Sequence, residues 1–321
     1  MRRPVLVVIT AFILVILGAG AFFYHQIFLD WQQPADKTVF IRRGSSVAAI
    51  ARQLHEQDLI RSPAAFKIRA RLTGNTRNLK AGEYLIPARS SVSGIVKILA
   101  EGRTVLHRIQ AIEGLSNIEI LEIITQAEGL TGDVPYLPDY AGLMPETYFY
   151  SYGATRESIV NRMRNEMDSY LASAWENRTP GLPLRNKREA LILASIVERE
   201  THIPAERPKV ASVFINRLRK GMRLQSDPTV IFAVTDGRSR MERLLTTRDL
   251  RRDHPMNTYT RHGLPPVHIA NPSRSSIDAV LNPVETEYYF FVAHPDGGHS
   301  FSRTLAEHNR SVQIWRSRNR R

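Results

Sequence analysis

The N-terminal segment constrains this chain more than any other part of the sequence. No Asp, Glu, Lys or Arg occurs between Arg3 and Asp30, and most residues in between are aliphatic or aromatic. A run of this length covers the roughly 20 apolar residues that a membrane-spanning helix needs. Arg2 and Arg3 precede the run, and such positive residues stay on the cytoplasmic side. The sequence therefore predicts a single-pass anchor of the inner (cytoplasmic) membrane in residues 1–29, with the rest of the chain on the periplasmic or extracytoplasmic side.

A cleaved signal peptide is the alternative for this segment. Ala19-Gly20-Ala21 resembles the small-residue cleavage site that follows the apolar core of a signal peptide. The apolar run continues beyond it through Phe22, Phe23 and Tyr24, which favours an uncleaved anchor. The chain contains no cysteine, which excludes disulfides and thiolate metal sites and suits either the cytoplasm or an oxidising compartment.

The net charge of +13 suggests a polyanionic partner such as anionic lipid, an acidic wall polymer or nucleic acid. The sequence has no recognisable nucleic-acid motif and no basic stretch with the interleaved aromatic residues that stack on bases. We therefore expect no nucleic-acid partner.

Short strands and helices are expected in residues 30–103. VFI reads as a strand, GSSVAAIARQL as a glycine turn followed by a helix, AGEYLIP as a second strand, and SVSGIVKILAEG as a helix with Gly102 near its C-cap. This module resembles an expanded LysM-type glycan-binding unit. The alternative is a small α+β spacer that holds the next domain away from the membrane. Residues 104–150 are expected to hold a strand, a helix and a linker rich in Gly, Pro and Tyr, with the main domain boundary near residue 150.

The stretch LILASIVERETHIP, residues 191–204, predicts a buried helix that ends in two glutamates. Asn186 can cap this helix, its residues are apolar around most of the circumference, and Pro204 forbids its continuation. On a helical wheel Glu200 shares a face with bulky aliphatic residues, whereas Glu198 lies roughly 160° away. Desolvation on that face should raise the pKa of Glu200 toward neutrality.

A protonated carboxyl at the wall of a cleft can deliver its proton to a glycosidic oxygen, which is the general-acid step of enzymes that cut sugars. The alternative is that Glu198 and Glu200 are solvated at a frayed helix end. Acidic residues at that end oppose the helix macrodipole, which argues against a purely incidental pair. We expect Glu200 to be functional and Glu198 to be incidental.

Downstream motifs occur in an order that points to a family. SIVERET is followed by KVASVFINRLRKGMRLQSDPTVIF, NTY, GLPPVHIANP and GGHSFS. This series resembles that of the endolytic murein transglycosylases, the YceG-like family, and the resemblance covers nearly the whole chain. It implies an α+β protein whose residues 151–321 form a mainly helical, lysozyme-like catalytic domain with a β-hairpin, and a lyase activity on peptidoglycan.

The resemblance also implies site residues. It places the catalytic carboxyl on the glutamate before threonine, which is Glu200. The matching motifs would line or shape the cleft with Gln225, Asp227, Thr229, Asn257, Tyr259, Pro265, Pro266 and Asn271. Asp227 can alternatively act as the N-cap of a helix that begins with Pro228. The sequence departs from the family pattern at Glu146, Phe232, Met256 and Ser273.

The mechanism expected from the resemblance uses one carboxyl group. Glu200 protonates the oxygen between MurNAc and GlcNAc, and then accepts the proton of the MurNAc C6 hydroxyl as that oxygen closes onto C1. The product is a 1,6-anhydro end, and no water is consumed. The family cuts inside nascent strands near the membrane, which limits strand length and implies contact with the membrane peptidoglycan synthases.

Two alternative functions remain at this stage. A hydrolytic muramidase normally needs a second carboxylate, for which Asp227 and Asp236 are the nearest candidates. A membrane-tethered glycan-binding scaffold needs no catalytic group. No cofactor is expected, and no metal, because the histidine spacings match neither HExxH nor a paired helical site. His299, in the second strand of an expected hairpin, either reaches the cleft or stabilises the hairpin.

Overall fold

The structure is a computed structural model that describes residues 2–28, 35–238, 240–294 and 297–318. It has the predicted α+β composition: many helices accompany three two-stranded sheets in the described part of the chain. The chain divides into two compact units. The N-terminal unit comprises Met1–His107 and Phe149–Ala154, and the C-terminal unit comprises Arg108–Tyr148 and Thr155–Arg321.

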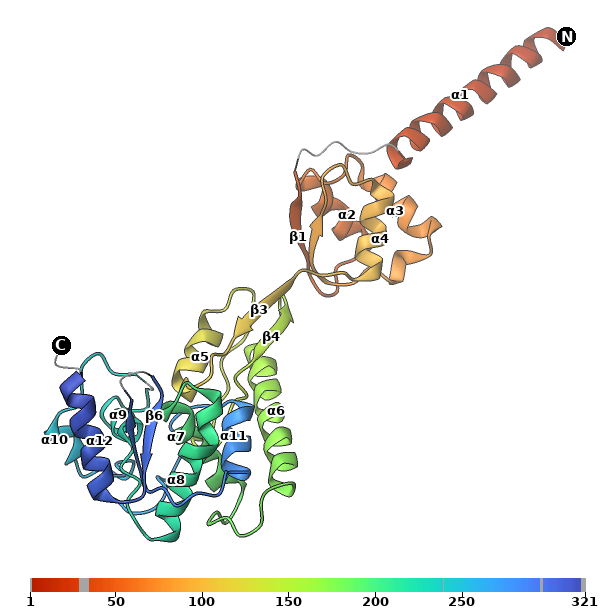
Figure 1. Ribbon diagram of the computed structural model, residues 1–321. Coiled ribbons are helices and arrows are strands. Elements are labelled where there is room, and N and C mark those ends of the chain that lie inside the picture. The colour runs from red at the N-terminus through yellow and green to blue at the C-terminus, as the bar shows by residue number, and fades with distance from the viewer. Residues whose placement is uncertain (1, 29–34, 239, 295–296, 319–321) are drawn as a thin grey trace. The chain divides into compact units, whose positions relative to one another are not determined.

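The apolar N-terminal segment forms helix α1 (Arg2–Phe28), drawn in red in Figure 1. Apolar side chains in its described middle part, such as Phe12, Leu14 and Leu17, are exposed. Over the described residues, no helix combines the length and the apolar content that crossing a membrane requires. The predicted end of the anchor at residue 29 lies outside the described residues.

The rest of the N-terminal unit packs helices against a small antiparallel sheet. Its elements are β1 (Lys37–Ile41), α2 (Val47–Glu56), α3 (Pro63–Leu72), the short helix η1 (Asn75–Arg77), β2 (Gly82–Ile86) and α4 (Val92–Glu101). β1 pairs with β2 so that Val39 lies opposite Tyr84, and both side chains are buried. The expected helices and strands are confirmed, and Gly102 ends α4 with a φ of 74°, which glycine adopts without strain.

Strand β3 (Leu106–Gln110) pairs with β4 (Thr147–Ser151). β4 lies in the segment whose Gly, Pro and Tyr content predicts a linker. Tyr148 and Tyr150 are buried while Phe149 between them is exposed, which is the two-residue period of a half-buried strand. Tyrosine is favoured in strands, so this segment contains a local strand signal beside its turn residues.

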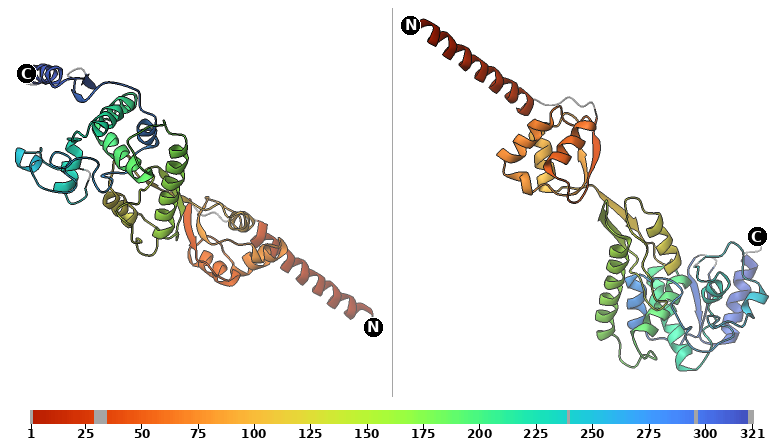
Figure 2. Two further views of the ribbon diagram at one scale, coloured as in Figure 1. Left: turned by 90° about the horizontal axis from the view of Figure 1, so that it is seen from below. Right: turned by 180° about the vertical axis from the view of Figure 1, so that it is seen from behind.

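The C-terminal unit is built around one buried helix. Its helices are α5 (Asn117–Gln126), α6 (Arg156–Glu176), α7 (Lys187–Glu200), the short η2 (Pro204–Glu206), α8 (Arg207–Arg219), α9 (Asp227–Val234), α10 (Thr247–Leu250), α11 (Arg274–Leu281) and α12 (Leu305–Arg318). α7 contacts α6, α8, α9 and α11, and Figures 1 and 2 show α8 and α11 beside it. Leu193 and Ile196 of α7 have no exposed surface, and the Asn186 side chain caps its first turn as predicted. The chain segment after α7 is therefore anchored by a rigid, packed helix.

The expected hairpin consists of β5 (Phe290–Ala293) and β6 (His299–Ser302), with Phe290 opposite Ser302. Phe291 contacts the rings of Phe214 on α8 and of Phe301. α12 follows a capping box: the Glu307 amide donates to the Thr304 hydroxyl, and the Thr304 amide donates to the Glu307 carboxylate.

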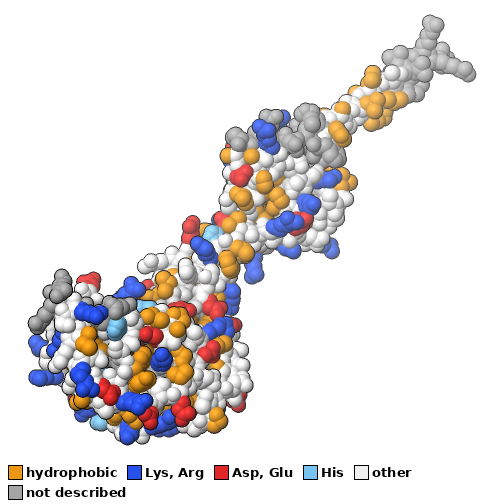
Figure 3. Space-filling model, in the orientation of Figure 1, with side chains coloured by type: hydrophobic (Ala, Val, Ile, Leu, Met, Phe, Trp, Pro, Cys, Tyr) orange, Lys and Arg blue, Asp and Glu red, His pale blue; other side chains and the backbone are white. Residues whose placement is uncertain are grey.

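The space-filling view in Figure 3 shows Lys and Arg side chains spread among acidic ones on the visible faces of both units. On these faces the positive charge is dispersed rather than gathered into one stripe.

Candidate active site

Glu200 is the last residue of α7, and it is partly buried. One of its carboxyl oxygens accepts a hydrogen bond of 2.5 Å from the Ser226 hydroxyl. Thr201 follows as the C-cap, and its amide still donates to the Val197 carbonyl. Hydrogen bonds thus hold both the backbone that follows Glu200 and the Glu200 carboxyl group.

The surroundings of Glu200 raise its pKa to about 7, chiefly because burial removes water from the carboxylate. The Ser226 hydroxyl opposes this rise, the nearby charge of Asp227 adds to it, and the cations of Arg217 and Arg199 oppose it. The direction agrees with the one expected from its aliphatic neighbours. A carboxyl with a pKa near neutrality can both hold and release a proton at physiological pH.

Ser226 is the N-cap residue of α9, yet in the described structure its side chain makes no capping bond to that helix. The hydroxyl is directed to Glu200 instead, while the Ser226 amide donates to the Thr258 hydroxyl at 2.9 Å. The alternative of Asp227 as N-cap is wrong, because α9 begins one residue earlier than expected and Asp227 is its first helical residue. Pro228 in the first turn tolerates this start, and a carboxylate there favours the helix dipole.

Asp227 and Tyr259 form a pair beside Glu200. The Tyr259 hydroxyl donates to a carboxylate oxygen of Asp227 at 2.6 Å. Burial raises the pKa of Tyr259 well above its usual range, and the negative charges of Asp227 and Glu200 act in the same direction. Of the residues placed in the cleft by motif, Asp227 raises the pKa of Glu200, and Tyr259 is close enough for the charge of Glu200 to act on it.

Arg217 on α8 is a further charged neighbour that sequence reasoning missed. Its guanidinium donates to the carbonyls of Tyr289 at 2.7 Å and Leu224 at 2.5 Å, and the side chain is buried. Burial lowers the pKa of Arg217, and the charge of Glu200 opposes this. A signal was present in the sequence, because Arg217 falls at helical spacing after Val210 and Phe214 on the apolar face of α8.

Three predicted cleft residues are buried and bonded within the protein. Asn257 donates to the carbonyls of Leu250 and Arg252, and the Thr229 hydroxyl donates to the Ser226 carbonyl. Asn271 joins three segments: it accepts from the Leu143 amide at 2.7 Å and donates to the Leu115 carbonyl and the Asn117 side chain. These contacts shape the loops around the site.

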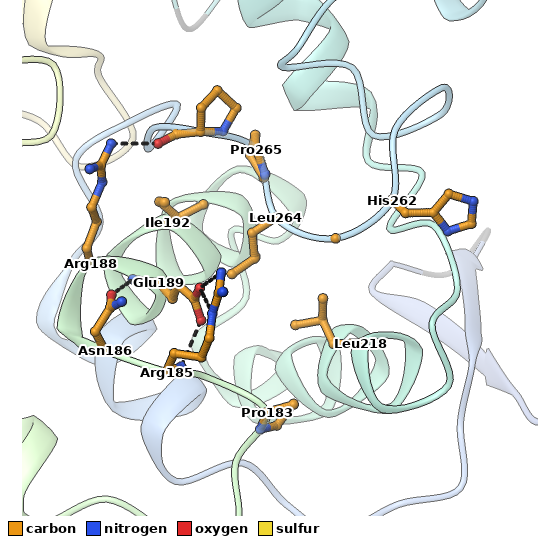
Figure 4. A pocket seen from close by; sticks show the side chains of 12 residues that line it. Pro183, Arg185, Asn186, Arg188, Glu189, Ile192, Leu218, His262, Leu264 and Pro265 are labelled. Atoms are coloured by element: carbon orange, nitrogen blue, oxygen red, sulfur yellow. Dashed lines mark hydrogen bonds and ion pairs between the residues drawn. The ribbon is translucent and has the colours of Figure 1, made fainter.

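Gln225 and Pro265 lie in different surroundings. Gln225 precedes Ser226, is exposed, and has a φ of 50°, the left-handed region that non-glycine residues rarely adopt. Pro265 and Pro266 line a cavity at the first turns of α7, at the opposite end of the helix from Glu200 (Figure 4). The structure therefore does not bring these two prolines together with the catalytic candidate.

Glu198 is a buried structural residue, so the expectation that it is incidental is wrong. One carboxylate oxygen accepts from the Arg207 guanidinium at 2.8 Å, and the other accepts from the Ser273 amide at 2.8 Å and the Ser273 hydroxyl at 2.5 Å. Ser273 is also the N-cap of α11. Ser273 is one of the positions at which the sequence departs from the family pattern. Its hydroxyl links the start of α11 to Glu198 near the end of α7.

His299 stabilises the hairpin in the described structure. Its amide donates to Glu206 at 2.9 Å and its ring Nδ1 lies 2.7 Å from the other carboxylate oxygen of Glu206. The Thr201 hydroxyl also donates to Glu206, at 3.4 Å. Glu206 therefore connects the residue that follows Glu200 to strand β6.

Asp236, the other candidate for a second carboxylate, follows the far end of α9. It lines a separate cavity of about 300 Å³ together with Phe232 and His268. Asp227, at the start of the same helix, is the carboxylate that acts on Glu200.

The model of the YceG-like family matches residues 39–314 of the chain. The chain belongs to this family. The chain is similar to the endolytic murein transglycosylase of Bacillus subtilis (strain 168), with 31% identity over 92% of this chain and 89% of that protein. The endolytic murein transglycosylase of Streptococcus pneumoniae serotype 2 (strain D39 / NCTC 7466) is 26% identical over 93% of this chain, and the chain spans 63% of its length.

The fold is also similar to that of a solved YceG-like protein. The 2.6 Å crystal structure of this protein from Listeria monocytogenes has a TM-score of 0.52 and 28% identity, and the match covers 86% of this chain and 98% of that one.

Proposed function

We propose that this YceG-like protein is an endolytic peptidoglycan lytic transglycosylase that cuts the β-1,4 bond between MurNAc and GlcNAc in nascent strands and so limits their length. The enzyme class, a lyase, follows from the family and from relatives that are named endolytic murein transglycosylases. The observation that supports the specific bond and product is the single carboxyl of Glu200, with a pKa of about 7 at the end of a buried helix.

The first step of the proposed reaction is proton transfer from Glu200 to the glycosidic oxygen, which breaks the bond between that oxygen and C1 of MurNAc. The positive charge that develops at C1 is stabilised by the Glu200 carboxylate that remains and by polar groups nearby. The C6 hydroxyl of MurNAc then attacks C1 and gives its proton to Glu200. The enzyme returns to its starting protonation state, and the new chain end is 1,6-anhydro-MurNAc.

The neighbours of Glu200 suit a group that alternates between acid and base. Burial favours its protonated form before the cut, whereas the Ser226 hydroxyl and the charges of Arg217 and Arg199 favour the carboxylate after it. Opposing influences of this kind keep the pKa near the working pH.

The test is to incubate the full chain in detergent with purified peptidoglycan and to identify the released fragments by mass spectrometry. Anhydro-ended fragments from the wild type and none from Glu200→Gln are expected. Fragments with reducing ends would replace this proposal with a hydrolytic muramidase, for which the proximity of Asp227 is the supporting observation. If Glu200→Gln cut as well as the wild type, the assignment of the acid would be wrong, and a folded wild type that released nothing would favour a non-catalytic, membrane-tethered glycan-binding scaffold.

Membrane tethering is part of the proposal. It is supported by the uncharged run between Arg3 and Asp30 and by the exposed apolar side chains of α1. We expect the full chain, but not residues 35–321, to float with lipid vesicles in a density gradient. Equal flotation of both would contradict the anchor, and with it the placement of the C-terminal unit on the periplasmic or extracytoplasmic side.

A LysM-like role for the N-terminal unit is supported by its order of strand, two helices and strand. Glycan binding would be measured as co-sedimentation of the Glu200→Gln chain with insoluble peptidoglycan. If the N-terminal unit is only a spacer, it contributes nothing to this co-sedimentation. Contact with a membrane synthase follows from cutting nascent strands. In-cell crosslinking from exposed positions tests this contact: a crosslink to a synthase supports it, and the absence of one contradicts it.

A further inference from the structure

A cavity of about 530 Å³ lies at the start of α7. It is lined by the first turns of this helix, by Leu218 on α8 and by the loop of residues 262–266, which contains the GLPP motif (Figure 4). The mechanism proposed above uses none of these residues.

Both polar and apolar side chains line the cavity, and its edge is cationic. Figure 4 shows Ile192, Leu218 and Leu264 directed toward the space between the segments. At the edge, Arg185 is neutralised by Glu189, whose carboxylate accepts its Nε at 2.6 Å.

Arg188 provides the remaining positive charge. Its guanidinium donates to the Pro266 carbonyl at 2.8 Å and lies 5.4 Å from the centre of the Tyr140 ring. Among the described residues no carboxylate forms an ion pair with it. A guanidinium has five N–H donors, so a fixed Arg188 retains donors for a carboxylate ligand.

Of the cavity residues on α7, Glu189 lies on the same side of the helix as Glu200, whereas Arg188 lies about 120° from Glu200 around the axis. Glu189 and Glu200 are eleven positions apart on this helix, which places them about 20° apart around its axis and about 16 Å apart along it. Arg223 connects the two places on the surface, because it donates to the Tyr259 carbonyl at 3.2 Å and to the His262 ring at 3.3 Å.

We propose that this cavity binds the peptide that the substrate sugar bears on its lactyl group, with Arg188 receiving a carboxylate of that peptide. The inference rests on the proposed function, because it takes the cut MurNAc unit to lie at Glu200. An extended peptide of about five residues spans about 17 Å, which matches the separation along α7. Ile192, Leu218 and Leu264 suit short apolar side chains, and no Phe, Tyr or Trp, the usual partners of a sugar ring, is among the described lining residues.

The experiment compares two substrates: glycan strands that bear peptides, and the same strands stripped of peptides by an amidase. The variant Arg188→Glu should cut peptide-bearing strands with a KM raised about tenfold, the effect of losing a charge-assisted bond, and bare strands at the wild-type rate. Arg310→Glu, the same charge change at an exposed position on α12, is the matched control and should cut both as the wild type does. Leu264→Trp, which fills the cavity and leaves Arg188 in place, should reproduce the selective loss.

A binding measurement separates this proposal from the lytic function. Calorimetry with a free synthetic peptide of the stem sequence and the full-length Glu200→Gln chain in detergent should detect binding that Arg188→Glu weakens about tenfold. Binding without any anhydro product would leave the cavity assignment intact and remove the lytic proposal. No binding, or an equal loss on both substrates in Arg188→Glu, would overturn the cavity assignment even if anhydro products form.

Discussion

At the scale of single residues, the Ser226 hydroxyl limits the rise that burial causes in the pKa of Glu200. Because this bond favours the carboxylate, Ser226→Ala should raise the pKa of Glu200 above about 7. The alkaline limb of kcat against pH should then move to higher pH, while kcat itself falls because the carboxyl is less well held. Ser226→Thr keeps a hydroxyl and should retain the wild-type profile. A shift of the limb to lower pH would show that the serine acts in another way.

The raised pKa of Glu200 also has a stability consequence. Its carboxyl binds a proton more tightly in the folded chain than in the unfolded one. Below the unfolded pKa the group is protonated in both states and does not lower the free energy of unfolding. As the pH rises from the unfolded pKa to about 7, the free energy of unfolding falls. Glu200→Gln removes this effect and should stabilise the chain by up to about 3 kcal/mol at pH 8. Denaturant titrations at pH 8 and pH 4 check this, since little difference from the wild type is expected at pH 4.

Substitution of Glu198 should destabilise the chain, whereas substitution of Glu200 should stabilise it at pH 8. Glu198→Gln removes the closer of two carboxylates from the buried Arg207, leaving Glu113 at 3.8 Å, and weakens the bonds to Ser273, so the free energy of unfolding should fall by about 3 kcal/mol. Chemical denaturation measures this. In the double variant Glu198→Gln, Arg207→Met the loss should be smaller than the sum of the single losses, and strict additivity would mean that the pair is not coupled.

At the scale of elements, Glu206 links the β5–β6 hairpin to the residue after Glu200. Burial alone would raise the pKa of Glu206, but the hydrogen bonds from His299 outweigh it and lower the pKa. The stabilisation is therefore present above the unfolded pKa of this carboxyl and is lost as the pH falls through its folded pKa.

Glu206→Gln should consequently speed hydrogen exchange of the His299 amide at pH 7 and leave α6 unchanged. Gly298 shows how closely the hairpin approaches this carboxylate: its φ is 72°, and an added Cβ would come within 2.4 Å of a Glu206 oxygen. If exchange at His299 were unchanged, the bond would not hold the hairpin.

The helices were the most predictable elements, because their signals are local. Asn186, Thr304 and the apolar period of α7 each indicate a helix without reference to the rest of the chain. β4 was not anticipated, since turn residues surround its five residues.

The raised pKa of Glu200 could be predicted for the same local reason, because its aliphatic neighbours lie on its own helix. Ser226 and Arg217 could not be placed as easily, because their positions depend on how α8 and α9 pack beside α7. The buried role of Glu198 depends on Arg207 and Ser273, which are distant from it in sequence or on another helix.

At the scale of the whole molecule, Asn271 joins segments that are far apart in the sequence. Its side chain bonds to residues 115, 117 and 143, all of which precede α7. Asn271→Ala should leave the buried Leu143 amide and the Asn117 side-chain oxygen without this partner and lower the free energy of unfolding by about 3 kcal/mol, measured by denaturant titration. Asn282→Ala at the exposed end of α11 serves as control. A loss as small as that of the control would mean that these segments are held by other contacts.

The division into two units also bears on how such a protein can change over generations. The chain enters the C-terminal unit at residue 108, returns to the N-terminal unit for residues 149–154, and then leaves it again. A single crossover between genes within residues 108–148 would therefore combine a complete first segment of the N-terminal unit with a foreign copy of its second, six-residue segment. Exchange of one unit alone requires recombination at two places, or compensating changes in residues 149–154. We therefore expect the two units to be inherited together.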